Sequence, residues 1–297
     1  MKVDDVKKIC VLGAGLMGNG IAQVCAQAGF QVAMRDIEDR FVENGMNSIK
    51  KNLSRAVKKE RMTQEQMDEI VGRIKGTVDL KNAATDADVV IEAIIEDRDL
   101  KRKVFAELET ICKPECVFAS NTSSISITDM AAATKRPEKF IGMHFFNPVP
   151  VMRLVEIIKG YETSEETYKF IDELSKKLGK DTVLVNEAPG FAVNRLLLPF
   201  LVEAIFALQE GVATVEDMDK AIRLGLNHPM GPFTLLDFVG LDTTLYIVDY
   251  MFNEFKESKY RAPALLRKMV RAGHLGRKSG KGFYDYTKNP PEPRSFR

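Results

Sequence analysis

Residues 8–36 read KICVLGAGLMGNGIAQVCAQAGFQVAMRD: an apolar run, a glycine-rich turn, an amphipathic stretch and a second apolar run. The turn has the pattern G-x-G-x-x-G, with glycines at positions 13, 15 and 18. In such a unit the first glycine makes the tight turn, the second lets a pyrophosphate approach the backbone, and the third lets helix and strand pack closely. The helix N-terminus then offers amide donors to the phosphates. The pattern therefore predicts a Rossmann-type doubly wound sheet that holds a dinucleotide at Gly13, Gly15, Leu16, Met17 and Gly18.

Asp36 ends the second apolar run and is the residue expected to select the cofactor. A carboxylate at this position accepts hydrogen bonds from the adenosine ribose hydroxyls and repels a 2′-phosphate. We therefore expect NAD as the cofactor. Arg35 beside it would attract the extra phosphate of NADP, which keeps NADP as an alternative.

Short apolar runs alternate with longer amphipathic stretches up to about residue 185, and this alternation indicates βαβ units with a parallel sheet. The expected strands are residues 9–12, 32–34, 89–91, 117–119, 141–143, 155–158 and 183–185. Residues 40–75 are charged and favour helix, so we expect a helical pair inserted after the second strand.

Beyond Glu187 the pattern is helical, without a convincing strand. Helices are expected at residues 191–208, 215–224, 235–255 and 262–272. The sequence thus predicts an α/β protein, with a sheet domain at residues 1–187 and an all-helical domain at residues 188–297. Pro189-Gly190 is a plausible hinge between them.

The composition and the apolar stretches indicate whether the protein binds nucleic acid or a membrane. The 297 residues include 43 Lys+Arg and 42 Asp+Glu, so no global field attracts nucleic acid or a membrane surface. The richest apolar stretch, residues 196–208, is interrupted by Pro199 and Glu203 and is too short to span a bilayer. The N-terminus does not resemble a signal peptide. We expect a cytoplasmic protein.

The four cysteines, at positions 10, 25, 112 and 116, do not predict a metal site. Cys112 and Cys116 have a C-x3-C spacing, but a second ligand pair is missing and the three histidines are scattered. Reduced cysteines that pack as small hydrophobic residues are the better interpretation.

Polar residues follow several of the expected strands, namely Glu96, Asn121, Ser123 and His144. In an open parallel sheet the ligand crevice lies beyond the carboxyl ends of the strands. Taken singly, each could be a loop residue, and Ser123 could simply begin the next helix. Their shared place at one sheet edge predicts a site.

His144 and Glu156 are expected to form a pair. A lone histidine is often only structural, but Glu156 lies in an apolar strand where a carboxylate is costly to bury unless it is paired. A carboxylate that orients an imidazole is typical of a general acid/base.

Residues 50–59, KKNLSRAVKK, concentrate positive charge. A solvated helix face is the ordinary interpretation of such a run. Asn52, Arg55 and Lys59 share one helical face, so binding of a phosphorylated carrier competes with that interpretation.

Seven stretches between Lys8 and Tyr286 together resemble the 3-hydroxyacyl-CoA dehydrogenase family, most closely the stand-alone bacterial 3-hydroxybutyryl-CoA dehydrogenases. They are GAGLMGNGIAQ, VIEAIIED, SNTSSISIT, GMHFFNPVPVMRLVEII, APGFAVNR, NHPMGPF and GRKSGKGFYDY. The resemblance implies NAD-dependent interconversion of (S)-3-hydroxybutyryl-CoA and acetoacetyl-CoA.

The resemblance also implies roles for individual residues. His144 would be the catalytic base, paired with Glu156, while Ser123 and Asn194 contact the substrate oxygens. The C-terminal helices would form a dimer. The residues implied to line the NAD site are Asp36, Glu96, Lys101, Asn121 or Ser123, Asn147 and Lys278. Asn52, Arg55 and Lys59 fall where the family contacts CoA, although Arg55 stands where a lysine is common.

Two other functions remain open from the sequence. One is a dehydrogenase of the same fold that acts on a free hydroxy acid, for which the basic face would be mere surface. The other is a non-catalytic NAD-binding protein, since the fold does not guarantee activity.

Overall fold

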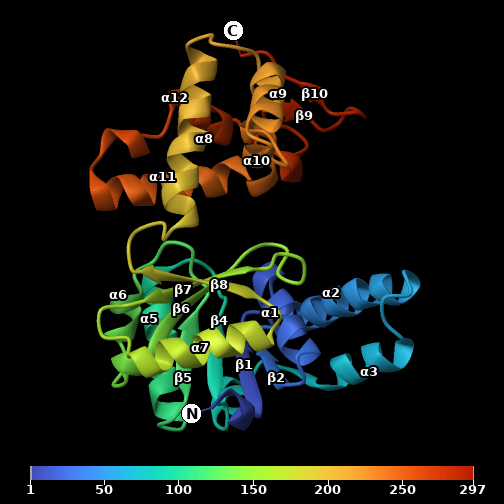
Figure 1. Cartoon of the computed structure of the whole chain (residues 1–297), viewed down its shortest axis with the longest axis vertical. Coiled ribbons are helices and arrows are strands. Elements are labelled where there is room, and N and C mark those ends of the chain that lie inside the picture. The colour runs from blue at the N-terminus through green and yellow to red at the C-terminus, as the bar shows by residue number, and fades with distance from the viewer. Residues whose placement is uncertain (1, 297) are drawn as a thin grey trace. The chain divides into compact units, whose positions relative to one another are not determined.

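The computed structural model describes residues 2–296, and the chain divides into two compact units. The first ends at Phe191 and the second begins at Ala192 (Figure 1). Within residues 2–296, no helix has both the length and the apolar character needed to cross a membrane.

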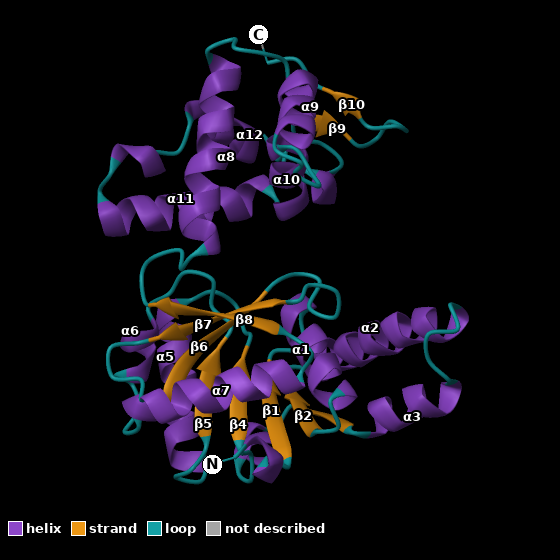
Figure 2. Cartoon of the chain, in the orientation of Figure 1, coloured by secondary structure: helices purple, strands orange, loops and turns teal. Residues whose placement is uncertain are grey.

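The first unit is built around an eight-stranded sheet with the order β3-β2-β1-β4-β5-β6-β7-β8 (Figure 2). The strands are β1 Lys8–Leu12, β2 Gln31–Arg35, β3 Ile74–Thr77, β4 Val89–Glu92, β5 Val117–Ser120, β6 Phe140–Phe145, β7 Leu154–Lys159 and β8 Asp181–Asn186. The predicted α/β class with a doubly wound sheet is confirmed. Because side chains alternate along a strand, Ile9 and Val11 enter one core while Cys10 and Leu12 enter the other.

Two features of the sheet differ from the prediction. Strand β7 is antiparallel to β6, because residues 146–153 between them are too few for a crossover connection. Strand β3 was not predicted, since its sequence IKGT has no apolar run, and it joins the edge of the sheet beside β2.

Helices cover both faces of this sheet. Those that contribute to the core with Ile9 are α1 Leu16–Gln27, α2 Asp39–Lys58, α3 Gln64–Gly72 and α7 Glu165–Lys177. Those on the other face are α4 Leu80–Ala84, α5 Arg98–Ile111 and α6 Ile127–Ala131, and short 3-10 turns lie at Val3–Asp5 and Pro137–Lys139. Helices α2 and α3 are the inserted pair expected after the second strand.

The second unit is mainly helical, as predicted. Its helices are α8 Val193–Gln209, α9 Val215–Gly225, α10 Pro232–Val239, α11 Leu241–Phe255 and α12 Ala264–Arg271, with 3-10 turns at Ser258–Tyr260 and Arg277–Ser279. The single helix expected at residues 235–255 is wrong, because Gly240, with φ of 101°, separates α10 from α11. A two-residue ribbon, β9 Tyr284–Asp285 with β10 Glu292–Pro293, was also not predicted.

Candidate active site

The glycine turn after β1 has the geometry of a phosphate-binding loop. Gly13 has φ of 97°, and a Cβ there would lie 2.4 Å from the Ala93 carbonyl oxygen. A Cβ on Gly18 would lie 1.8 Å from the Gly13 oxygen, so α1 packs directly on the turn. A Cβ on Gly15 would meet no atom within 4 Å. Since Gly15 is also the N-cap residue of α1 and offers no side-chain cap, this open place beside the helix N-terminus fits a pyrophosphate.

Asp36 lies directly after β2 and is tied to the glycine turn. One carboxylate oxygen accepts a hydrogen bond from the Ala14 amide at 2.7 Å, and the other accepts from the Ile37 amide at 2.7 Å. Arg35 donates instead to the Val78 carbonyl, at 3.1 Å, in the loop after β3. Asp36 is therefore held at the edge where the adenosine ribose of a bound dinucleotide would lie.

The register of the sheet brings the other polar residues to this same edge. Leu12 pairs with Glu92, Glu92 with Ser120, and Ser120 with Gly142, across β1, β4, β5 and β6. Asn121 and His144 therefore follow at the same edge as the glycine turn. The Asn121 carboxamide oxygen accepts from the Phe145 amide at 2.8 Å, which links the ends of β5 and β6.

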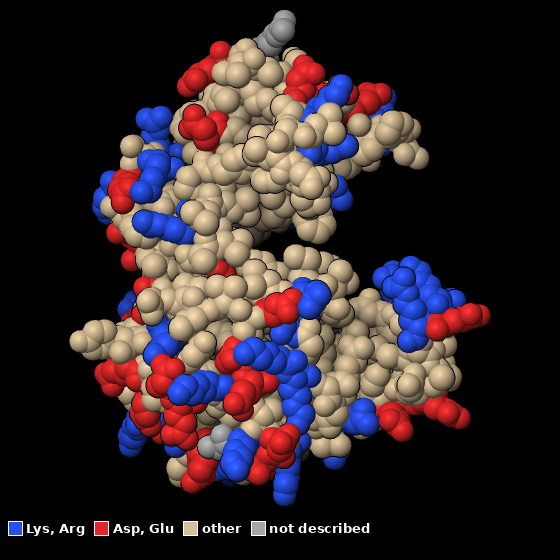
Figure 3. All heavy atoms as spheres, in the orientation of Figure 1, with Lys and Arg blue, Asp and Glu red and all other residues tan. Residues whose placement is uncertain are grey.

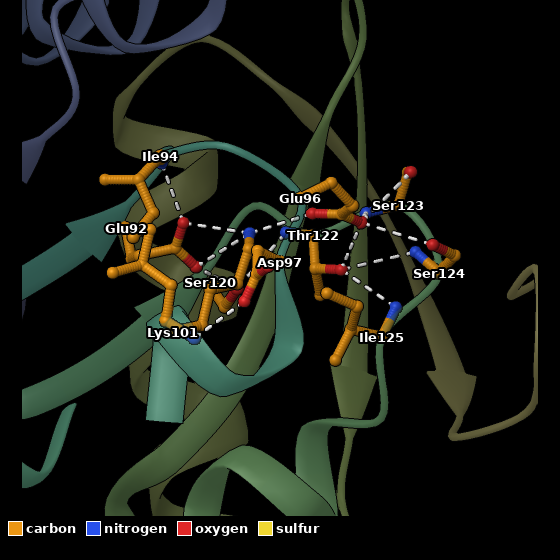
Figure 4. A network of polar contacts seen from close by, with 11 residues as sticks. Glu92, Ile94, Glu96, Asp97, Lys101, Ser120, Thr122, Ser123, Ser124 and Ile125 are labelled. Atoms are coloured by element: carbon orange, nitrogen blue, oxygen red, sulfur yellow. Dashed lines mark hydrogen bonds and ion pairs between the residues drawn. The ribbon is translucent and has the colours of Figure 1, made fainter. Parts of the chain in front are cut away.

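A buried ion pair lies at the end of β4 (Figure 4). The Lys101 ammonium contacts both Glu92 carboxylate oxygens, at 2.9 and 3.1 Å, and the Glu96 carboxylate at 2.8 Å. Burial raises the pKa of Glu92 in spite of Lys101. Burial opposes ionisation of Glu96 too, but Lys101 and the hydroxyl and amide donors around it outweigh that effect and lower its pKa. The two carboxylates in turn overcome the burial of Lys101 and raise its pKa.

Glu96 organises the loop that carries Ser123. Its other oxygen accepts from the Thr122 hydroxyl at 2.6 Å, the Ser123 amide at 2.9 Å, the Ser123 hydroxyl at 3.3 Å and the Ser124 hydroxyl at 3.2 Å. Figure 4 shows these donors grouped around the one carboxylate. A single side chain from the β4–α5 loop thus fixes the loop that follows β5.

His144 and Glu156 face each other across the antiparallel pair β6 and β7. They are register partners, and the distance between His144 Nδ1 and the Glu156 carboxylate is 2.8 Å. Glu156 is 1% exposed and His144 is 7% exposed. The imidazole also lies against Phe146 and Phe191, with ring centroids 4.6 and 5.7 Å away. Because Nδ1 is engaged, Nε2 is the nitrogen left to exchange a proton.

The remaining predicted residues lie in the turn after β6 and in the second unit. Asn147 is exposed in the turn after β6. Asn194 lies in the first turn of α8 in the second unit and is half-buried. Lys278, also in the second unit, lies in the 3-10 turn Arg277–Ser279, and its ammonium contacts Asp242 at 2.6 Å.

The basic face lies at the C-terminal end of α2. Figure 3 shows Lys and Arg side chains gathered there. Arg55 and Lys59 are exposed, Asn52 is half-buried, and their side chains have no hydrogen-bond or ion-pair partner within residues 2–296. The charges of Arg55 and Lys59 are therefore free to meet an anion.

Three residues of this edge were not selected from the sequence. Glu92 could have been found, because a carboxylate that ends an apolar strand needs a partner, as Glu156 does. Thr122 gave no separate signal. Lys180, 6% exposed, donates to the Met152 carbonyl at 2.8 Å and to the Val149 carbonyl, which holds the loop between β6 and β7.

Comparison with known proteins agrees with this geometry. Residues 8–188 match the family model described as 3-hydroxyacyl-CoA dehydrogenase, NAD binding domain, and residues 190–286 match its C-terminal domain. The chain belongs to the 3-hydroxyacyl-CoA dehydrogenase family. The predicted resemblance and the NAD cofactor are thereby confirmed, and the chain is an NAD-dependent oxidoreductase.

Individual relatives match over nearly the whole chain. A probable 3-hydroxybutyryl-CoA dehydrogenase of Bacillus subtilis is 50% identical over 282 residues, which cover 95% of this chain and 98% of that protein. The 3-hydroxybutyryl-CoA dehydrogenase of Bradyrhizobium diazoefficiens is 49% identical, with 97% and 98% covered. The crystal structure of (S)-3-hydroxybutyryl-CoA dehydrogenase from Ralstonia eutropha is similar with a TM-score of 0.92 and 47% identity, covering 96% of this chain and 100% of that one.

Proposed function

We propose that this enzyme interconverts (S)-3-hydroxybutyryl-CoA and acetoacetyl-CoA, with His144 and Glu156 as the acid/base pair. The observation that carries the proposal is the 2.8 Å contact between these two side chains at the edge that also holds the glycine turn and Ser123. An imidazole oriented by a buried carboxylate is suited to proton transfer beside a hydride carrier.

Each residue has a defined part in the reaction. Bound NAD supplies the hydride acceptor, or the donor in the reverse direction. His144 Nε2 takes the proton of the 3-hydroxyl during oxidation and returns it to the 3-keto oxygen during reduction. Glu156 fixes the ring through Nδ1 and stabilises the protonated imidazole. Ser123 and Asn194 hold the substrate oxygens.

The choice of a short CoA thioester rests on the relatives and on the basic face. The relatives described above are named for 3-hydroxybutyryl-CoA. The unpartnered charges of Arg55 and Lys59 suit the phosphates of CoA. A free hydroxy acid would make no use of that face.

A direct assay tests the substrate. Oxidation of NADH is followed by absorbance with acetoacetyl-CoA, with acetoacetate, and without substrate. We expect turnover with acetoacetyl-CoA alone. Equal rates with acetoacetate would favour the free hydroxy acid, and an inert protein that still binds NADH would favour the non-catalytic alternative.

Glu156→Gln tests the acid/base pair, because it keeps the size of the side chain and removes its charge. The imidazole of the variant should lose its proton at lower pH, so the alkaline limit of acetoacetyl-CoA reduction should move toward acid. The rate at neutral pH should fall by about tenfold. The measurement is kcat against pH, and an unshifted profile would mean that Glu156 does not act through its charge.

We also propose a homodimer formed by the second unit. Its exposed apolar side chains include Leu196, Val212, Leu224 and Leu226, which are 77%, 70%, 71% and 58% exposed. Such surface is typical of a protein interface. Sedimentation at micromolar concentration tests the proposal, and a monomer would refute it.

A further inference from the structure

We propose that Lys180 is a positioning residue for the reaction, because it holds the loop that follows His144. This β6–β7 loop comprises residues 146–153 and carries Phe146 and Asn147. The inference deepens the proposed function and rests on it, since it concerns the surroundings of the imidazole that exchanges the proton.

The direction of the last two strands brings Lys180 to the edge of the proposed active site. Lys180 directly precedes β8, and in a wholly parallel sheet such a residue lies at the edge away from the ligand crevice. Strand β7, however, runs antiparallel to β6, and β8 runs parallel to β7. The amino end of β8 therefore lies at the same edge as the carboxyl end of β6, where His144 is.

The Lys180 ammonium is bound by backbone carbonyls of the β6–β7 loop. It donates to the Met152 carbonyl at 2.8 Å and to the Val149 carbonyl. Lys180 is 6% exposed, and no carboxylate pairs with it in the part of the chain that the structure describes, residues 2–296. Burial lowers its pKa. Because a buried ammonium is costly unless it is hydrogen-bonded, the loop cannot leave Lys180 without a large penalty.

Helix α1 meets the same loop. A Cβ on Gly20 of α1 would lie 2.8 Å from the Val149 Cβ, so the helix and the loop are in close contact. Val149 itself is 2% exposed. Since α1 begins at the glycine turn, the loop is fixed to Lys180 and also to the helix that would hold the pyrophosphate. Lys180 thus helps to set the position of the loop relative to the cofactor site.

The loop carries two side chains that matter to the proposed reaction. The Phe146 ring lies 4.6 Å from the His144 ring, between centroids, and Asn147 is a residue that the resemblance implies for the NAD site. The Val151 and Met152 amides both donate to the Pro148 carbonyl at 2.9 Å, so the loop is a compact turn. A shift at Met152 should therefore reach Asn147. An error of about 1 Å at a reaction site can lower the rate by about 10²-fold.

Three variants test the proposal: Lys180→Met, Lys180→Gln, and Arg136→Met as the control. Arg136 is also a buried cation of the first unit, 7% exposed, and it donates to the Lys113 and Cys116 carbonyls. Cys116 directly precedes the parallel strand β5, so this contact lies at the edge of the sheet away from His144. The control therefore removes a buried cation without touching the β6–β7 loop.

Four quantities are measured for each variant. The melting temperature, the hydrogen exchange of the peptide that covers residues 146–153, and the NADH affinity by fluorescence titration need no substrate. The fourth is the pair kcat and KM with acetoacetyl-CoA. A residue that only supports the fold would change the melting temperature and leave kcat of the folded enzyme unchanged.

Lys180→Met should speed exchange at residues 146–153 by at least about tenfold, because two hydrogen bonds from a charged donor are lost. Its kcat should fall by about 30-fold. KM and NADH affinity should stay within about threefold of the wild type, because the basic face of α2, the glycine turn and Asp36 are unchanged. Lys180→Gln keeps N–H donors and should lose less, about threefold in kcat.

Arg136→Met should lower the melting temperature without changing kcat of the folded enzyme or exchange at residues 146–153. If Lys180→Met keeps the kcat of the wild type, the proposal is overturned. An equal loss of kcat in Arg136→Met would overturn it too, because the effect would then follow from lost stability. If Lys180→Met does not fold, Lys180→Gln decides: unchanged kcat and unchanged exchange would overturn the proposal.

The proposed function can fail separately from this inference. A wild type that binds NADH but does not reduce acetoacetyl-CoA would refute the proposed function alone. Exchange at residues 146–153 that is no faster in Lys180→Met than in the wild type would refute the inference alone, because that measurement uses no substrate.

Discussion

Both units bury carboxylates, but the partners of these carboxylates differ. In the first unit Glu92 and Glu96 share the Lys101 ammonium at the edge of the sheet. In the second unit the donors to Asp237 among residues 2–296 are all neutral, namely the Phe283 and Tyr284 amides and the Tyr286 hydroxyl. Burial, together with Asp219, raises the pKa of Asp237 against these donors.

The hydrogen bonds of Asp237 and Asp219 join segments of the second unit that are far apart in the sequence. Asp219 accepts from the Phe233 amide at 2.8 Å and the Tyr284 hydroxyl at 2.9 Å. A Cβ on Gly282 would lie 1.9 Å from the Asp237 carboxylate, so glycine is required for this close approach. Two of the motifs typical of the family, NHPMGPF and GRKSGKGFYDY, thus meet these aspartates. The second unit uses its buried carboxylates to join loops through neutral donors, whereas the first pairs them with a buried ammonium at the edge that holds the proposed active site.

The largest expected effect is a loss of catalysis when His144, in the first unit, is replaced. His144→Ala should lower kcat for acetoacetyl-CoA reduction by a factor of about 10² to 10⁴, because the proton donor is lost. NADH affinity should change little, while the melting temperature should fall because the buried Glu156 carboxylate loses its partner. A variant that loses NADH binding as well would show that the sheet edge depends on His144 for its structure, and the contrast with the second unit would weaken.

Asp237→Ala should mainly lower the stability of the protein and leave kcat nearly unchanged. It leaves several buried donors without an acceptor, so the free energy of unfolding should fall by about 3 kcal/mol. Calorimetry gives the loss, and kcat of the folded fraction should remain near that of the wild type. Glu216→Ala, at an exposed residue of α9, is the matched control and should be neutral. A folded Asp237→Ala enzyme without activity would place Asp237 in the chemistry.

The basic face of α2 provides a test of substrate binding in the first unit, separate from catalysis. The double variant Arg55→Ala/Lys59→Ala should raise KM for acetoacetyl-CoA by about tenfold and weaken its dependence on salt, while kcat at saturation changes little. Lys50→Ala, on the opposite face of the same helix, is the control. An equal loss with acetoacetate esters that lack the nucleotide would show that Arg55 and Lys59 are structural.

The smallest effect concerns an ion pair at the surface of the first unit. Hydrogen bonds from Arg98 lower the pKa of Asp129, and Arg102 adds to the effect. Asp129 therefore contributes stability above its ordinary pKa of 3.8, and this is lost as the pH falls through the lowered value. Asp129→Asn should cost up to about 1 kcal/mol at neutral pH and nothing in strong acid. Unfolding curves from pH 7 to about pH 2 check this, and a difference that does not vary with pH would contradict it.

The comparison also shows which elements a sequence pattern can predict. Strand β1 and helix α1 were predicted because local apolar periodicity and the glycine spacing point to the same structure. Strand β3 was missed because its residues are ordered by pairing with β2, which no local pattern records. The break at Gly240 was missed because an apolar stretch continues through it.

The sequence by itself determined the α/β class, the dinucleotide turn, the cofactor and the family, since these depend on local spacing and on motifs in order along the chain. Only the tertiary structure decided that Glu92, Lys101 and Glu96 form one network with residues 122–124, because their contacts depend on the pairing of β4 with β5. It likewise decided that His144 meets Glu156, because the antiparallel turn between β6 and β7 sets the register of the two strands. Contacts between residues far apart in the chain are fixed by strand pairing and burial, which a linear pattern does not contain.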